Sequence, residues 1–217
     1  MRSLFSIPRV SLTPLVSNLA VGVVVAAILL IAPATAPFLT TALIPVASAA
    51  CPDAEVVFAR GRFEPPGVGA IGDAFVNALR SKTARSVGVY GVNYVADLDA
   101  ANGARDIGAH VRSMARDCPN TRMVVGGYSI GATAADLFAR ANSLPPDINR
   151  HVAAIVLFGN GTRRLGPAPA YAGRTIDQCA DGDPICGRGL NWDSHLQPSY
   201  LGSGLVDQAA SIVAGKL

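Results

Sequence analysis

The first fifty residues of the sequence contain no aspartate or glutamate at all. All 15 acidic residues fall at positions 51–217, together with 16 of the 18 basic residues, so this part of the chain has a net charge near +1. Such a balance lacks the excess of positive charge with which proteins bind the phosphate backbone of nucleic acids. We therefore expect no nucleic-acid partner.

The first fifty residues instead contain the order of features that is typical of an export signal. Arg2 and Arg9 precede a long apolar stretch at about 15–31, and the small residues Ala47-Ser48-Ala49 offer a cleavage site. The apolar stretch is also long enough for an uncleaved membrane anchor, which is the alternative. Prolines after it shorten the continuous helix and favour cleavage. We predict a secretory signal over 1–50 and a secreted or cell-envelope-associated protein.

Metal-binding cysteine patterns are absent as well. The four cysteines lie at positions 51, 118, 179 and 186, with no C-x2-C spacing, and none of the three histidines lies near either pair. An even number of cysteines in an exported chain indicates disulfides. Cys179 and Cys186 bracket a turn-rich segment, so a local bridge is the simplest choice, and it leaves Cys51 to pair with Cys118.

Residues 51–217 contain no internal repeat and no linker, so we expect one domain there. Stretches typical of strands alternate with stretches typical of helices, which predicts a parallel sheet covered by helices on both faces. The predicted strands are 55–59, 86–94, 122–128 and 151–158, and the predicted helices are 71–81, 103–117 and 131–142. Residues 159–198 have little periodicity and are predicted to form a functional loop region, before a final helix at 203–214.

Residues 126–132 read GGYSIGA and place Ser129 between two glycines in a G-x-S-x-G frame. This frame is typical of a nucleophile elbow, a sharp turn from a strand into a helix that holds a serine at its apex. A Cβ at either glycine would collide with the neighbouring strand or helix. The frame is short and also fits an ordinary glycine-rich turn, but its place between a predicted strand and a predicted helix favours the elbow.

A serine nucleophile of this kind needs a histidine and an acid from later loops. His195 is the histidine that follows Ser129 within the loop region, whereas His110 lies in a predicted helix and His151 begins a predicted strand. The interpretation of those two as structural or surface residues is therefore preferred, and His195 is the candidate base.

The acid must be held rigidly to orient the imidazole. Asp183 has that rigidity because it lies inside the loop that Cys179 and Cys186 would close. Sequence spacing makes it only the favoured candidate; the alternatives in the same region, which also suit solvated turns, are Asp177, Asp181 and Asp193.

Several motifs together resemble the cutinase family of secreted serine esterases, in its actinobacterial branch. They are Cys51 with VVFARG at 56–61 and Glu64-Pro65, GYSIG at 127–131, the FGNG turn, CADGDPIC at 179–186, and the lone His195. The resemblance implies an α/β-hydrolase-type three-layer sandwich with a central, mainly parallel five-stranded sheet and no lid domain. It implies Ser129 as nucleophile, Asp183 as acid and His195 as base, with the bridges Cys51 to Cys118 and Cys179 to Cys186.

The resemblance also implies an oxyanion hole made by the backbone N–H groups of Ile130 and Arg62. Glutamine is usual at the first position and a serine or threonine at the second, so both side chains depart from the better-studied fungal members. The backbone donors survive these changes, whereas the supporting hydroxyl is lost, which lowers the expected efficiency more than it changes the reaction. Arg62 could instead meet an anionic head group.

The expected reaction is hydrolysis of carboxylic esters of lipids or cutin-like polyesters through an acyl-enzyme, without metal or organic cofactor. We expect a monomer that makes peripheral contact with membrane or cell-envelope lipid. Two alternatives stay open: a cell-envelope acyltransferase with the same triad, and a catalytically weak lipid-binding surface protein. An acyl groove and core packing are equally good interpretations of four apolar residues of the tail, Leu190, Trp192, Leu196 and Tyr200.

Overall fold

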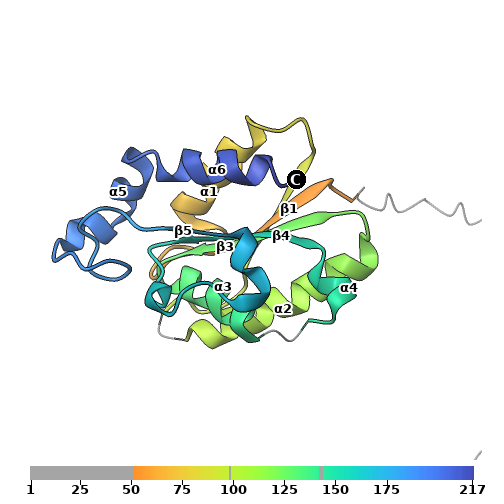
Figure 1. Ribbon diagram of the computed structural model, residues 1–217, viewed down its shortest axis with the longest axis horizontal. Helices are drawn as coiled ribbons and strands as arrows, with labels where there is room; N and C mark the ends of the chain where they lie inside the picture. The colour runs from red at the N-terminus through yellow and green to blue at the C-terminus, as the bar shows by residue number, and fades with distance from the viewer. Residues whose placement is uncertain (1–50, 98, 142–143) are drawn as a thin grey trace, which may run out of the picture. The chain divides into compact units, whose positions relative to one another are not determined.

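The computed structural model describes residues 51–97, 99–141 and 144–217, and a five-stranded sheet runs through this part of the chain (Figure 1). The strand order is β2-β1-β3-β4-β5, and every neighbouring pair is parallel. The predicted export signal lies outside the described residues. The strands are β1 (Ala54–Ala59), β2 (Val87–Gly91), β3 (Arg122–Tyr128), β4 (Val152–Phe158) and β5 (Thr175–Gln178).

Helices cover both faces of the sheet and complete three layers, as expected (Figure 1). Against one face pack α1 (Gly69–Arg80) and α6 (Leu205–Ala214), with α5 (Gln197–Gly202) beside them. Against the other pack α2 (Ala100–Asp117) and α3 (Ile130–Ala141), with the short α4 (Pro146–Asn149) next to α2. Within the described ranges, no helix combines the length and the apolar character that crossing a bilayer requires.

The central strands read as continuous apolar runs because they are buried on both faces. Every residue of β1 and β4 is buried. The helices begin close to their predicted positions, and the largest difference is in α2, which starts three residues earlier than its apolar spacing indicates. Asp99 explains this start, since its side chain accepts hydrogen bonds from the N–H groups of Ala101 and Asn102 and caps the helix.

The loop region after β4 contains more regular structure than the sequence predicts. It holds β5 and three short 3-10 helices, η1 (Arg163–Leu165), η2 (Pro169–Arg174) and η3 (Trp192–His195). The sequence of β5 is TIDQ, in which Ile176 is the one buried residue. A four-residue edge strand with one apolar side chain gives no alternation or apolar run to detect, so the prediction of an irregular segment was wrong at 175–178.

The strand order has a switch point between β1 and β3, the neighbouring strands from which the chain continues toward opposite edges of the sheet. After β1 the chain crosses to β2 on one side, and after β3 it crosses to β4 on the other. In open parallel sheets, ligands bind outside the carboxyl ends of the strands at such a switch point. The residues that directly follow β1 and β3 are therefore the first place to look for a site, and Ser129 is one of them.

Candidate active site

Ser129 lies at the sharp turn between β3 and α3. Its φ angle is +56°, a left-handed conformation that is uncommon for a residue with a side chain and indicates a strained backbone. Both flanking glycines are required by close backbone contacts. A Cβ at Gly127 would lie 2.2 Å from the carbonyl oxygen of Gly131 at the start of α3, and a Cβ at Gly131 would lie 2.0 Å from the carbonyl oxygen of Ala59 in β1.

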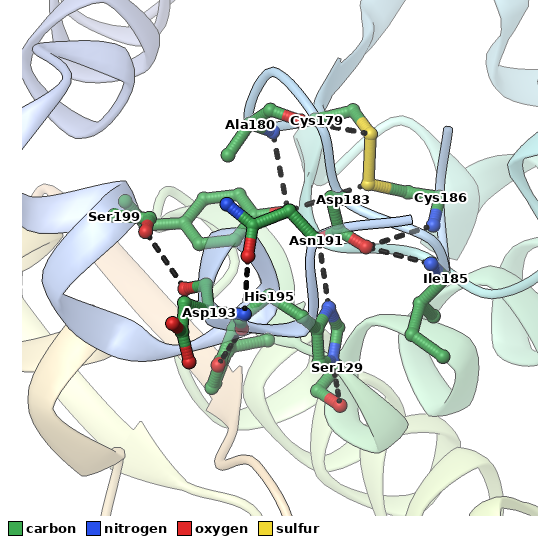
Figure 2. A network of polar contacts seen from close by, with 12 residues as sticks. Ser129, Cys179, Ala180, Asp183, Ile185, Cys186, Asn191, Asp193, His195 and Ser199 are labelled. Carbon is green, nitrogen blue, oxygen red and sulfur yellow. Dashed lines mark hydrogen bonds and ion pairs between the residues drawn. A yellow bond between two sulfur atoms is a disulfide. The ribbon is translucent and has the colours of Figure 1, made fainter. Parts of the chain in front are cut away.

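Three side chains from distant parts of the sequence meet at this turn (Figure 2). The Oγ of Ser129 lies 2.8 Å from Nε2 of His195, and Nδ1 of His195 lies 2.7 Å from Oδ2 of Asp183. With the proton on Nδ1 donated to the carboxylate, Nε2 is left to accept the serine hydroxyl proton. This arrangement can convert a serine hydroxyl into a nucleophile.

The carboxylate of Asp183 is fully buried and accepts hydrogen bonds at both oxygens. Its Oδ1 accepts from the N–H groups of Ile185 at 2.7 Å and Cys186 at 3.3 Å (Figure 2). Burial alone would raise the pKa of the carboxyl, but the hydrogen bonds that it accepts from Tyr200 and His195, with one from a backbone N–H, hold that pKa below its usual value. Asp183 is thus kept ionised beside the imidazole.

Disulfides form between Cys179 and Cys186 and between Cys51 and Cys118, the pairing that the sequence favours. The first closes the small loop that carries Asp183 (Figure 2). The two cysteines of that loop also lie close to the Asp183 carboxylate, but their sulfurs are joined to each other and are not available as metal ligands.

Two tyrosine hydroxyls contact this group of side chains in a way that the sequence did not predict, since Tyr200 was considered there only as an apolar groove or core residue. The hydroxyl of Tyr200, a fully buried residue of α5, donates to Oδ2 of Asp183 at 2.6 Å, the oxygen that His195 also contacts. The hydroxyl of Tyr128 donates to the backbone carbonyl of His195, and its ring packs against the imidazole with centroids 5.7 Å apart. An isolated tyrosine in a strand or helix carries no sequence signal for either contact.

The other two histidines lie elsewhere, as expected. His110 in α2 stacks on the ring of Tyr90 with centroids 3.6 Å apart and contacts Glu55 at 2.8 Å. His151 is buried just before β4, with Nδ1 3.4 Å from the carbonyl oxygen of Thr121. Both histidines thus contact other parts of the protein and not Ser129.

The alternative acids do not contact His195. Asp177 lies in β5, where Oδ2 accepts from the side chain of Asn160 at 3.2 Å, and burial raises its pKa to about 6. Asp181 is exposed in a turn, and Asp193 is exposed in η3. Geometry therefore selects Asp183 from the four carboxylates that sequence spacing left open.

The loop that follows β1 also contributes to this site, and Glu64 holds the loop in place. The Glu64 carboxylate accepts from the N–H of Gly61 at 2.5 Å, the N–H of Ala70 at 2.8 Å and the side-chain amide of Gln197 at 2.6 Å. Gln197 lies two residues after His195, so Glu64 links the loop that carries Arg62 to the turn that carries the histidine.

Arg62 does not present a free cation to the site. Its guanidinium forms an ion pair with Asp97 at 2.6 Å, and it lies over the ring of Phe63 at 4.6 Å. The carboxylate neutralises the charge that suggested an anionic head group at this position. Arg62 and Ser129 line the same cavity, and Ile130 is the first residue of α3, so its N–H has no partner within the helix.

A cavity of about 450 Å³ contains Ser129, His195 and Arg62. Apolar side chains dominate the rest of its lining, and Trp192 and Leu196 are among them, so the acyl-groove interpretation fits these two residues. Tyr200 is buried in the core, and Leu190 is 92% exposed and lies outside the cavity lining. The remaining apolar or aromatic lining residues are Phe63, Tyr128, Ile185 and Pro198.

By fold, a parallel sheet with a serine at a strained turn after its central strand defines an α/β hydrolase. The particular family follows from comparison with known proteins: the family model for cutinases matches residues 50–217. The chain therefore belongs to the cutinase family, and it is a carboxylic ester hydrolase.

The chain is 50% identical to the probable carboxylesterase Culp2 of Mycobacterium tuberculosis over 216 residues, which cover 91% of this chain and 94% of Culp2. It is 48% identical to the phospholipase Culp4 of the same species over 82% of this chain and 85% of Culp4. Among solved structures, a Trichoderma reesei cutinase in complex with a phosphonate inhibitor matches with a TM-score of 0.65 and 32% identity, covering 76% of both chains.

Proposed function

We propose that this protein is a secreted serine esterase that hydrolyses carboxylic esters of lipids or of cutin-like polyesters. The observation that carries the proposal is the continuous contact from the Ser129 hydroxyl through His195 to the Asp183 carboxylate at 2.8 and 2.7 Å. The names carboxylesterase and phospholipase of the two mycobacterial relatives support the substrate class.

In the proposed mechanism, His195 removes the proton of Ser129 as the hydroxyl oxygen attacks the ester carbonyl. The negative charge that develops on the carbonyl oxygen is bound by the N–H groups of Ile130 and Arg62. Asp183 keeps the imidazole in the required tautomer and stabilises its charged form. The alcohol leaves with a proton from His195. A water molecule then attacks the acyl-enzyme with His195 again as the base, and the proton returns to the oxygen of Ser129 as the acid is released.

The apolar lining of the cavity supports the proposal that the acyl part of the ester is a hydrocarbon chain. Trp192 and Leu196 are 65% and 53% exposed, so they can pack against an acyl chain without displacing core residues. This exposure also fits peripheral contact with a lipid surface, and the proposed localisation outside the cytoplasmic membrane follows from the export signal expected over 1–50.

The experiment is hydrolysis of p-nitrophenyl esters from short to long acyl chains by the wild-type protein and by Ser129→Ala. We expect the substitution to lower kcat by at least about 10⁴-fold. Ser211→Ala is the control. It removes an exposed hydroxyl from α6 and should keep wild-type activity. Equal activity of Ser129→Ala and wild type would refute the role of Ser129.

Covalent labelling separates the lipid-binding alternative from an enzyme, and product analysis separates an acyltransferase from a hydrolase. A fluorophosphonate reacts with an activated serine, so a lipid-binding protein without catalysis would not be labelled at Ser129. An acyltransferase would be labelled but would release more acyl-acceptor product than free acid when a lipid or sugar alcohol is added.

A further inference from the structure

A second cavity, of about 400 Å³, has a strongly basic lining. Three of its lining residues are arginines, Arg163, Arg164 and Arg188, and the other two are Cys186 and Gly187. No acidic residue belongs to this lining in the described part of the chain. The cavity therefore concentrates positive charge in a protein whose described domain is nearly neutral.

The three arginines come from two segments that are held against each other. Arg163 and Arg164 lie in η1 after β4, whereas Arg188 follows the disulfide-closed loop. The Arg164 guanidinium donates to the carbonyl oxygen of Gly187 at 2.8 Å, which joins the segments directly. The 3-10 helix holds the backbone of Arg163 and Arg164, and the disulfide holds the backbone just before Arg188.

Most of the guanidinium donors in this cavity are unused by the protein. Arg188 forms no hydrogen bond and no ion pair with the residues that the structure describes, and Arg164 uses one of its five N–H groups. Arg163 forms an ion pair with Asp177 at 3.7 Å, a separation too long for a hydrogen bond, so its guanidinium N–H groups form no hydrogen bond with the described residues. The contrast is Arg62 in the active-site cavity, which is neutralised by Asp97 at 2.6 Å.

The arginine cavity adjoins the active-site cavity. Ile185 lines the cavity that contains Ser129, and the next residue, Cys186, lines the arginine cavity. Adjacent Cα atoms are about 3.8 Å apart, so one short segment of backbone contributes to the walls of both cavities. In Figure 2, Ile185 and Cys186 lie beside each other on the strand of chain that leads away from Asp183.

We propose that Arg163, Arg164 and Arg188 form a subsite for the phosphate group of an amphiphilic ester whose carboxylic ester lies at Ser129. Guanidinium groups match phosphate oxygens with paired N–H donors, which is why arginine is favoured for phosphate recognition. The inference rests on the proposed function, since it assigns the charged part of the substrate to a second place beside the same nucleophile.

The test compares two soluble substrates that differ only in the phosphate, dihexanoylglycerol and dihexanoylphosphatidic acid, both kept below the concentration at which they aggregate. We expect Arg188→Gln to lower kcat/KM for the phosphate ester by about tenfold, the size of one charge-assisted hydrogen bond, with the neutral ester changed less than about twofold. Arg164→Gln/Arg188→Gln should lower it further. Arg116→Gln removes the same charge from an exposed position at the end of α2 and should change neither rate.

Binding of the phosphate ester to Ser129→Ala by calorimetry separates this inference from the proposed function. Hydrolysis of the neutral ester, together with equal effects of Arg188→Gln on both substrates, would overturn the subsite and leave the esterase intact. Binding to Ser129→Ala that weakens on Arg188→Gln, in a protein that hydrolyses neither ester, would keep the phosphate site and reject the esterase. Glycerol 3-phosphate that binds as tightly as the lipid would overturn the assignment to a lipid substrate.

Discussion

The sheet framework, residues 54–158, and the loop region, taken here with α5 as residues 159–204, hold their parts of the candidate active site by different means. Ser129 is fixed by the backbone itself, because it sits between β3 and α3 with glycines in close contact on either side. His195 and Asp183 lie outside long helices and strands. Their positions depend on a disulfide and on individual side-chain hydrogen bonds.

Backbone and side-chain hydrogen bonds together connect these loops. The N–H of Asn191 donates to the carbonyl oxygen of Gly182 at 3.1 Å, which ties the turn that carries His195 to the loop that carries Asp183. The Asn191 side chain caps η3, and the Ser199 hydroxyl donates to the carbonyl oxygen of Asp193 at 2.8 Å (Figure 2). Changes in the framework should therefore act on folding, whereas changes in the loop region should act on catalysis.

Among single substitutions, the largest effect on stability is expected from Gly131→Ala in the framework. Its Cβ would lie 2.0 Å from the carbonyl oxygen of Ala59, and neither the strand nor the helix can move without breaking the sheet. We expect a loss of about 3 kcal/mol or more in the free energy of unfolding, measured by urea denaturation.

The matched substitution in the loop region is Gly202→Ala. Nothing lies within 4 Å of the added Cβ there, so the stability should stay within about 0.5 kcal/mol of wild type or rise slightly. Similar unfolding midpoints for the two variants would mean that close backbone contacts do not hold the turn at Ser129 in place.

The two disulfides allow the same comparison with catalysis as the readout. Removing the Cys179–Cys186 bridge by Cys179→Ser/Cys186→Ser frees the loop that carries Asp183. We expect kcat for a p-nitrophenyl ester to fall by about 100-fold, because displacement of a catalytic group by an ångström is enough for that loss. The stability should fall by about 2 to 3 kcal/mol.

Cys51→Ser/Cys118→Ser provides the control. This bridge spans 67 residues and lies before β1 and after α2, at the amino ends of the strands and away from Ser129. Its removal should cost about 4 kcal/mol of stability, more than the loss for the short loop, while kcat of the folded protein stays near wild type. A fall of kcat in this variant as large as in the first would show that the activity merely follows global stability.

The same contrast explains what the sequence could predict. The framework was predictable because buried parallel strands and amphipathic helices leave periodic apolar patterns, and because the glycines around Ser129 form a recognisable frame. Asp183 and His195 were found through the cysteine-bounded segment and the family resemblance, since spacing alone left four acids open. The hydrogen bond of the Tyr200 hydroxyl and the edge strand β5 were missed, because neither a contact between residues distant in sequence nor a four-residue strand with one buried side chain leaves a periodic pattern.

The smallest effect is expected from Tyr200→Phe, which removes one hydroxyl from the loop region and keeps the ring. That hydroxyl donates to the Asp183 oxygen that His195 contacts, so its loss should loosen the orientation of the imidazole and lower kcat by about tenfold without changing KM. Tyr171→Phe is the control, because the Tyr171 hydroxyl forms no hydrogen bond with the described residues and its ring is equally buried. Its kcat should match wild type.

The pH dependence of stability separates this contact from simple packing. The pKa of Asp183 lies below the usual 3.8, so its ionised form stabilises the folded state above about pH 4, and this contribution is lost as the pH falls through the lowered pKa. Because the Tyr200 hydroxyl helps to lower that pKa, Tyr200→Phe should be about 1.5 to 3 kcal/mol less stable than wild type at pH 7. The difference should shrink as the pH is lowered below about 4. A difference that is the same at pH 7 and pH 3 would mean that the hydroxyl contributes to packing and not to the charge of Asp183.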